Sequence, residues 1–296
     1  MANSIPGFTN TINAFNANLI EAELSKVTNA VIGQVTPFSA YTAKFSDVQS
    51  ATGTINIPIP VYSTGSGVNS FTIDDATATT KTINLSNDYT KFYAFNPVEM
   101  QNGGLQYLVT AFVKPAVYAI EAQLQSDAFA LLTNFATASI KPATATACSS
   151  SVVTALNAAL STAGINGERK LVLNSSYFWT GLMDDLSKKG NQAGADAIRS
   201  GSPNNPFNMG VYEAQLLPTA GNLVGFTGTA GGIIIGTAIP QVVHANGEQA
   251  VITTPSGLNV LVEKYFDESK RKYVVGCSVV GNVAVGNAAL LRIVSA

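Results

Sequence analysis

The sequence predicts an α+β protein, and three stretches of contrasting periodicity carry that prediction. Apolar residues recur at helical spacing over residues 10–35 and again over 99–137. Residues 54–95 instead alternate apolar and polar side chains with the period of two that is typical of strands. The remainder mixes helical and strand patterns and ends in strands, and elements segregated along the chain in this way favour the α+β class.

The first predicted element is an amphipathic helix within residues 10–35, which Gly33 and Pro37 bring to an end. Its apolar residues are Ile12, Phe15, Leu19, Leu24, Val27 and Val31. The pattern fits a helix on an extended arm and a helix packed on its own domain about equally well.

Residues 54–95 predict a long two-stranded hairpin. Its apolar positions are Ile55, Ile57, Ile59 and Val61 in one strand, then Ile83, Leu85, Tyr93 and Phe95 in the other. The segment between the strands is rich in Ser, Thr, Gly and Asp, which predicts a flexible tip. Pro58 and Pro60 cannot donate ladder hydrogen bonds and so suit an edge strand. Because an isolated hairpin is marginal in water, this one needs a surface to lie on.

Residues 99–137 predict an unusually long helix. Its stripe consists of Leu105, Leu108, Phe112, Ala116, Ile120, Leu124, Leu131 and Phe135. We expect Pro115 to kink this helix or to start a new one. At 1.5 Å per residue the whole stretch would span roughly 50 Å, the length of a strut.

Beyond the Thr/Ala/Ser-rich linker Lys141–Ser151, the pattern alternates helix and strand. Gly164 should end the first helix and Asn174 should cap the second. The predicted elements are a helix Val152–Leu160, a strand Lys170–Leu173, a helix Ser175–Lys189, and strands Gly232–Thr237, Leu258–Phe266, Tyr273–Val285 and Leu290–Val294.

The composition predicts self-association. Only 11% of the residues are charged and 46% are hydrophobic, whereas ordinary soluble domains carry roughly 25% charged residues. Surface charge keeps monomers apart, and interface cores are depleted in it. The net charge of −2 and the pI near 5.4 disfavour a basic nucleic-acid-gripping domain.

The sequence contains no membrane or secretory signal. Its apolar runs are short of the ~18 residues that a spanning helix needs, and Met1–Gly33 lacks a basic n-region. We therefore expect a protein made and folded in a cytosol, with no membrane partner.

We expect no catalytic, cofactor-binding or metal site. Any triad would need the single histidine, His244, but its neighbours Val242, Val243 and Ala245 suggest a strand edge, so we favour a structural histidine; the usual zinc spacings are absent. Cys148 and Cys277 lie far apart; one disulfide stays open, but we favour two buried thiols.

Other candidate motifs have simpler explanations. Gly225–Gly232 fits no phosphate or dinucleotide loop, so we interpret it as a turn or flexible segment. The pairs Asp74–Asp75 and Asp184–Asp185 are interpreted as solvated, and Lys270–Lys272 as a hydrated turn beside Asp267 and Glu268.

In element order the chain resembles the major capsid protein of tailed bacteriophages, the Johnson fold. The resemblance rests on Ile55–Val61 with Ile83–Phe95, the helix around Glu121, Arg169–Asn174 and Gly210–Pro218. It implies an N-terminal arm (1–50), an E-loop hairpin (51–97), a spine helix with part of the P-domain (98–148), an A-domain (149–245) and C-terminal P-domain strands (246–296).

The resemblance implies that the protein assembles into pentamers and hexamers of an icosahedral shell around packaged double-stranded DNA, built in the host cytoplasm and located in the virion. It implies contacts between subunits through Ile55, Ile57, Ile59, Val61, Phe71, Ile83 and Leu85 of the E-loop and through Ile12, Phe15 and Leu19 of the arm. The implied partners are other copies, a portal, non-specific DNA and, if Met1 is the true start, a separate scaffolding protein.

Some members of that family form Lys–Asn cross-links. Lys81 and Lys91 lie in or near the equivalent loop, and Asn282 and Asn287 lie in the P-domain range. No catalytic carboxylate can be placed beside them, so we favour non-covalent contacts.

Three other interpretations were weighed. An encapsulin-like nanocompartment shares the fold and would be marked by cargo enzyme without DNA. A surface-layer or adhesin protein is disfavoured by the missing signal peptide and the long apolar-striped helix. An enzyme without a recognisable motif is the least favoured.

Overall fold

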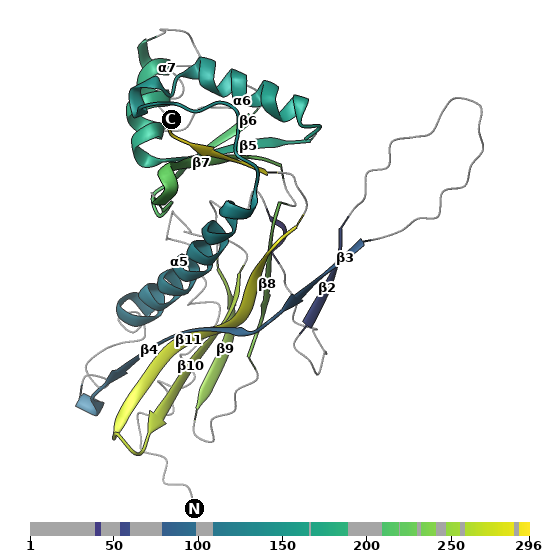
Figure 1. Cartoon of the computed structure of the whole chain (residues 1–296). Coiled ribbons are helices and arrows are strands. Elements are labelled where there is room, and N and C mark those ends of the chain that lie inside the picture. Colours follow the sequence, from purple (N-terminus) through teal and green to yellow (C-terminus); the bar gives the residue numbers. More distant parts are fainter. Residues whose placement is uncertain are drawn as a thin grey trace, which may run out of the picture.

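The computed structural model describes residues 39–42, 54–59, 79–98, 109–165, 167–188, 209–218, 220–229, 232–240, 247–254, 258–286 and 290–296. They form a six-stranded sheet with a long helix across one face, a four-stranded sheet with shorter helices, and a projecting two-stranded ribbon (Figure 1). The predicted α+β class is confirmed.

The strands are β1 (Ser39–Thr42), β2 (Thr54–Ile59), β3 (Thr79–Asn84), β4 (Asn87–Phe95), β5 (Arg169–Asn174), β6 (Met209–Ala214), β7 (Leu223–Gly228), β8 (Ile233–Ala238), β9 (Glu248–Thr253), β10 (Asn259–Asp267), β11 (Lys272–Val285) and β12 (Leu290–Val294). The helical segments are η3 (Val109–Val113), α5 (Lys114–Ala130), η4 (Leu131–Asn134), η5 (Ala145–Ala147), α6 (Ser150–Thr162), η6 (Tyr177–Met183), α7 (Asp184–Lys188) and η7 (Ala220–Asn222).

The large sheet is organised around β11, the longest strand. Its order is β1-β8-β11-β10-β9, and β4 pairs with β11 as well. The β-branched residues of β11 suit a strand buried on both faces, and Val275, Cys277 and Val279 are fully buried. These three belong to the main core cluster together with residues of α5.

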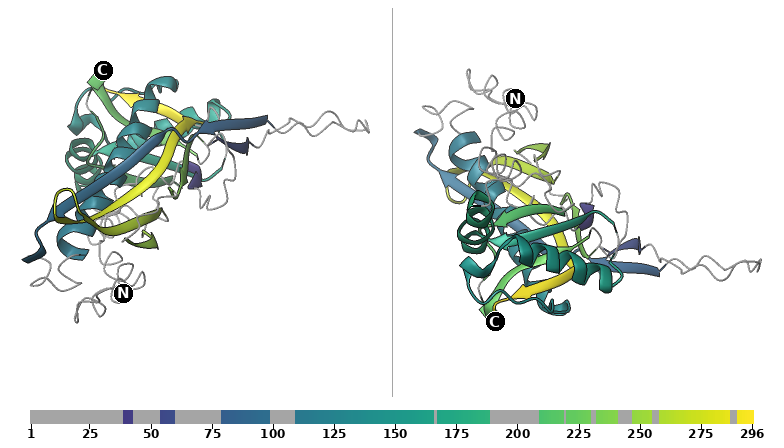
Figure 2. Two further views of the ribbon diagram at one scale, coloured as in Figure 1. Left: turned by 90° about the horizontal axis from the view of Figure 1, so that it is seen from below. Right: turned by 90° about the horizontal axis from the view of Figure 1, so that it is seen from above.

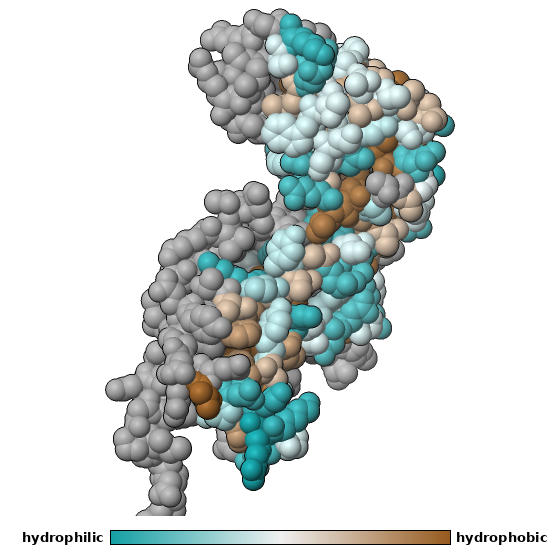
Figure 3. All heavy atoms as spheres, turned by 90° about the vertical axis from the view of Figure 1, so that its left-hand side faces the viewer, coloured by the Kyte–Doolittle hydropathy of each residue, from teal (hydrophilic) through white to brown (hydrophobic). Residues whose placement is uncertain are grey.

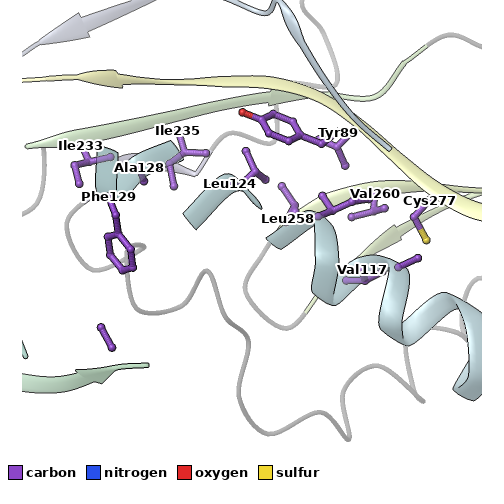
Figure 4. Packing of buried hydrophobic residues seen from close by; sticks show 14 of the residues in the cluster. Tyr89, Val117, Leu124, Ala128, Phe129, Ile233, Ile235, Leu258, Val260 and Cys277 are labelled. Carbon is purple, nitrogen blue, oxygen red and sulfur yellow. The ribbon is translucent and has the colours of Figure 1, made fainter. Parts of the chain in front are cut away.

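The long helix consists of η3, α5 and η4 in direct succession. Pro115 lies in the first turn of α5, directly after η3 and Val113 with its helical angles, so the helix runs on across Pro115 and changes from π- to α-helical geometry there. Ile120 and Leu124 pack toward the large sheet, as Figure 4 shows for Leu124. Residues 99–108, the predicted start of the helix, lie outside the described residues.

The small sheet has the order β12-β7-β5-β6 and forms a second core with α6, η6 and α7. Helix α6 ends as predicted: Gly164 has a φ of 71°, and the Ile165 N–H donates to the Leu160 carbonyl over 3.0 Å, which is the Schellman arrangement. Asn174 caps the next helix, because its Oδ1 accepts from the Tyr177 N–H at 3.0 Å. Phe129 of α5 meets Phe226 of β7 edge to face at 5.9 Å and joins this sheet to the helix.

One strand has a partner other than the one expected from the sequence. β4 was expected in the hairpin, yet it pairs with β11, which buries Tyr89 and Phe95 in the main core. β8 also pairs with β11, and β12 pairs with β7. Periodicity identifies a strand but not its distant partner, which packing selects. The domain limits themselves stay a prediction.

Two local interpretations were also wrong. Gly225 is no flexible turn but lies buried in β7, and Ser151 belongs to α6 rather than to the linker. Gly225 is required by packing: a Cβ there would come within 2.2 Å of the Val172 carbonyl oxygen.

Candidate interaction surfaces

The ribbon formed by β2 and β3 projects from the body of the molecule. The two strands pair antiparallel, with Ile55 opposite Ile83 and Ile57 opposite Lys81. Among the described strands, β2 and β3 pair only with each other. Figures 1 and 2 show the ribbon leading away from the body. A strand at the edge of a sheet is a template for contact with another chain.

The predicted contact residues divide into three groups. Ile83 is only 2% exposed and Leu85 is partly buried, so Ile83 has almost no surface left for another copy in this conformation. The structure describes the backbone of Ile55, Ile57 and Ile59. The others lie outside the described residues: Val61, Phe71, Ile12, Phe15 and Leu19.

A second surface is the outer face of the large sheet, opposite α5. We define this outer sheet face by Phe92, Tyr265, Val251, Leu261 and Glu263, which the strand registers place on one side. This face is open only in part: Phe92 is 37% exposed and Val251 47%, whereas Leu261 is 4% and Glu263 1% exposed. The Phe92 ring covers Gly276, where a Cβ would lie 2.3 Å from its Cδ1, and it meets Tyr265 edge to face at 6.5 Å. The sequence signal that could have revealed this face is Gly276, a glycine between Val275 and Cys277 inside a strand pattern.

Buried charged side chains lie on the strands of this sheet. Glu263 is 1% exposed, and the Ser278 hydroxyl donates to its Oε1 at 3.2 Å. On the helix-facing side, Lys264 Nζ lies 3.9 Å from Glu248 Oε2. Burial raises the pKa of Glu248 and lowers the pKa of Lys264, while their mutual attraction opposes both shifts. This pair is structural, because it lies within the sheet.

The small sheet contributes separate exposed apolar side chains. Trp179 on η6 is 47% exposed and its ring stands edge-on to Phe178 at 5.1 Å. Leu216, which follows β6, is 42% exposed. Figure 3 shows further apolar residues at the narrow junction between the upper and the lower parts of the molecule.

The aspartate pair predicted to be solvated has two different roles. Asp185 Oδ2 accepts a hydrogen bond from the Ser150 N–H, whereas Asp184 pairs with Lys188 on the surface. The turn 267–272 is exposed as predicted and closed by Asp267 Oδ1, which accepts from the N–H groups of Ser269 and Lys270. Asp74, Asp75 and His244 lie outside the described residues.

The remaining candidate groups are the metal-ligating residues, the cysteines and the residues for cross-links. The described residues contain no group of three or more His, Cys, Asp or Glu that could hold a metal ion. Cys148 and Cys277 are both free and buried, which confirms the two-thiol prediction. Of the residues considered for cross-links, Lys91 lies opposite Cys277 in the ladder and Asn282 donates from Nδ2 to its own chain's Asn84 carbonyl. Among the described helices, none is long and apolar enough to cross a membrane.

Comparison with known proteins shows the fold. No protein-family model and no curated protein sequence matches the chain. A solved structure titled as the capsid of the cyanophage P-SCSP1u matches with a TM-score of 0.50 and 12% identity, over 83% of this chain and 84% of that one. A phage-related protein from Bordetella bronchiseptica RB50 matches with a TM-score of 0.50 and 13% identity, over 93% and 96% of the two chains. The chain therefore shares the fold of tailed-phage capsid proteins.

Proposed function

We propose that this chain is a major capsid protein that self-assembles into pentamers and hexamers of an icosahedral shell enclosing phage double-stranded DNA. The observation that carries the proposal is the fold that this protein shares, over most of both chains, with a solved structure titled as a phage capsid. The portal, a scaffolding protein and the packaged DNA are its further proposed partners, and the virion is its proposed location.

Two properties of the chain support this function independently of the fold. The projecting ribbon is a sheet of only two strands in the described residues, and a marginal ribbon gains stability from lying on another subunit. The low charge, 11% of residues, suits surfaces that are buried between copies.

Assembly of the purified full chain tests the proposal, with sedimentation velocity and negative-stain microscopy as readouts. We expect closed shells from the natural sequence and none from Ile57→Asp, because a charge would be buried at a subunit contact. The matched control is Ala158→Asp, which puts the same charge on an exposed position of α6.

Three outcomes would count against the proposal. The first is monomers at high concentration, and the second is normal shells from Ile57→Asp, which would remove the role of the ribbon. The third is native particles that hold a cargo enzyme and no DNA, which would favour an encapsulin-like compartment.

A further inference from the structure

The base of the ribbon is the point where one continuous chain changes its strand partner. β3 ends at Asn84 and pairs with β2, while β4 starts at Asn87 and pairs with β11. Leu85 and Ser86 between them belong to neither ladder. The direction of the ribbon relative to the large sheet therefore depends on the backbone angles of these two residues and on what holds them.

The side chain of Asn282 on β11 forms hydrogen bonds to Asn84 and Ser86 at this junction, and we call this arrangement the clamp. Asn282 Nδ2 donates to the Asn84 carbonyl at 2.9 Å and lies 3.4 Å from Ser86 Oγ. The Ser86 N–H donates to the same carbonyl at 3.0 Å. The Asn282 Oδ1 is itself fixed by the Val283 N–H at 2.8 Å. Asn282 directly follows Gly281, the last residue of β11 that pairs with β4.

From the clamp, a series of hydrogen bonds between side chains leads to the long helix. Ser86 Oγ donates to Asn87 Oδ1 at 3.3 Å, and Asn87 Nδ2 donates to the Tyr89 hydroxyl at 3.2 Å. That hydroxyl donates to Asp127 Oδ2 of α5 at 2.6 Å. Every donor points toward Asp127, and such aligned bonds polarise and strengthen one another.

The helix end of this series of hydrogen bonds is anchored in the main core. The Tyr89 side chain is 6% exposed within the main core, and Figure 4 shows its ring beside the sheet that covers α5. Asp127 Oδ1 also accepts from Gln123 Nε2 at 3.1 Å. Burial, followed by the bond to Asp127, raises the pKa of Tyr89 to about 12, so the hydroxyl keeps its proton at neutral pH.

We propose that Asn282, Ser86, Asn87, Tyr89 and Asp127 form a relay that fixes the direction of the β2–β3 ribbon relative to helix α5, with Leu85–Ser86 as the pivot. A shift of α5 moves Asp127 and thereby the clamp, so the relay couples the helix to the ribbon. Asn282, Tyr89 and Asp127 act as positioning residues. The inference goes beyond the proposed function and concerns the free subunit.

Spin labels on the full-length, unassembled chain test the relay. One label is placed at Thr82→Cys on the ribbon and the other at Ala130→Cys at the end of α5, both exposed positions; the natural cysteines are buried and take no label. Double electron–electron resonance then gives the distribution of distances between the two labels. We expect one dominant distance in the otherwise natural chain.

Two near-isosteric variants break the relay at opposite ends. Asn282→Asp keeps the size of the side chain and loses the donor, and Tyr89→Phe keeps the buried ring and loses the hydroxyl. Losing a net hydrogen bond shifts an equilibrium by roughly three- to tenfold, so either variant should raise the population of other ribbon directions by about that factor. Tyr118→Phe is the control, because Tyr118 is on the same helix and 49% exposed.

The relay predicts that the double variant broadens the distribution little more than either single one, since both interrupt one chain of bonds. Unchanged distributions in both single variants would overturn the proposal. Broadening in Asn282→Asp but not in Tyr89→Phe would also overturn it, because the ribbon would then be held by the local clamp alone. Since no assembly is required, failure of the relay and failure of the capsid function give different results.

Discussion

The Asp185 carboxylate caps a helix that starts thirty-odd residues before it: its Oδ2 accepts a 2.7 Å hydrogen bond from the Ser150 backbone N–H at the start of α6. The first N–H groups of a helix have no intrahelical partner, and the side chain of Ser149 at the N-cap makes no capping hydrogen bond to the helix backbone. The neighbouring Asp184 instead pairs with Lys188 at 2.5 Å, with their side chains 44% and 73% exposed. Two adjacent, chemically identical residues thus have unequal importance.

This difference predicts the effect of two alanine substitutions. Asp185→Ala should lower the free energy of unfolding by about 1 kcal/mol, the usual cost of losing an N-cap. Asp184→Ala, its matched control, should cost about 0.3–0.5 kcal/mol, since an exposed i,i+4 pair contributes little. Urea denaturation followed by circular dichroism measures both, and equal costs would contradict the capping role.

Gly225 in β7 should not tolerate a side chain. A Cβ there would lie 2.2 Å from the Val172 carbonyl oxygen of the paired strand, a backbone atom that cannot move away alone. We expect Gly225→Ala to cost about 3 kcal/mol, the upper end for an overpacked core. Gly210→Ala is the control, because its Cβ meets only the Tyr212 ring, at 3.1 Å, and that ring is 36% exposed. Thermal denaturation measures both variants, and an equally small decrease of the melting temperature in both would refute this account of β7.

Phe129 should be a key contact between the long helix and the small sheet. It is 1% exposed and packs against Phe226, so Phe129→Ala should cost about 3–5 kcal/mol. Tyr118→Ala on the same helix should cost much less, because Tyr118 is half exposed. Chemical denaturation measures the stability of both variants. Similar denaturation midpoints would show that the long helix and the small sheet are not joined through the Phe129 ring.

The two thiols should be unreactive in the folded protein. Burial raises the pKa of Cys148 from 9.0 to about 11, and burial followed by the nearby Glu263 raises the pKa of Cys277. The folded state therefore keeps protons that the unfolded state loses, so stability falls as pH rises from about 9 toward 11. A thiol-specific reagent at pH 8 should find no fast-reacting group before denaturation and both cysteines after it. Absence of thiols in the denatured, unreduced chain would indicate a disulfide and contradict the structure.

Local elements were predictable where a short pattern determines them. Gly164 after α6, Asn174 before η6 and the strand Leu290–Val294 follow from capping and alternation, and the structure has all three. The partner of that last strand was not predictable, because β12 joins β7 and β5 in the small sheet through contacts far along the chain.

The candidate surfaces, too, were predictable only where a short sequence pattern determines them. Alternation at Ile55 and Ile57 predicted the ribbon, but Tyr93 and Phe95 alternate just as well and belong to the large sheet. The outer sheet face escaped prediction because it depends on Phe92 lying across Gly276, a relation between strands that no single stretch of sequence records.

Electron cryomicroscopy of particles formed by the full-length chain tests the central claim most directly. The account predicts closed shells with icosahedral symmetry, built from clusters of five and six copies, in which each β2–β3 ribbon lies against a neighbouring subunit. A chain that stays monomeric at high concentration, or that forms particles whose ribbons contact only their own subunit, would contradict it.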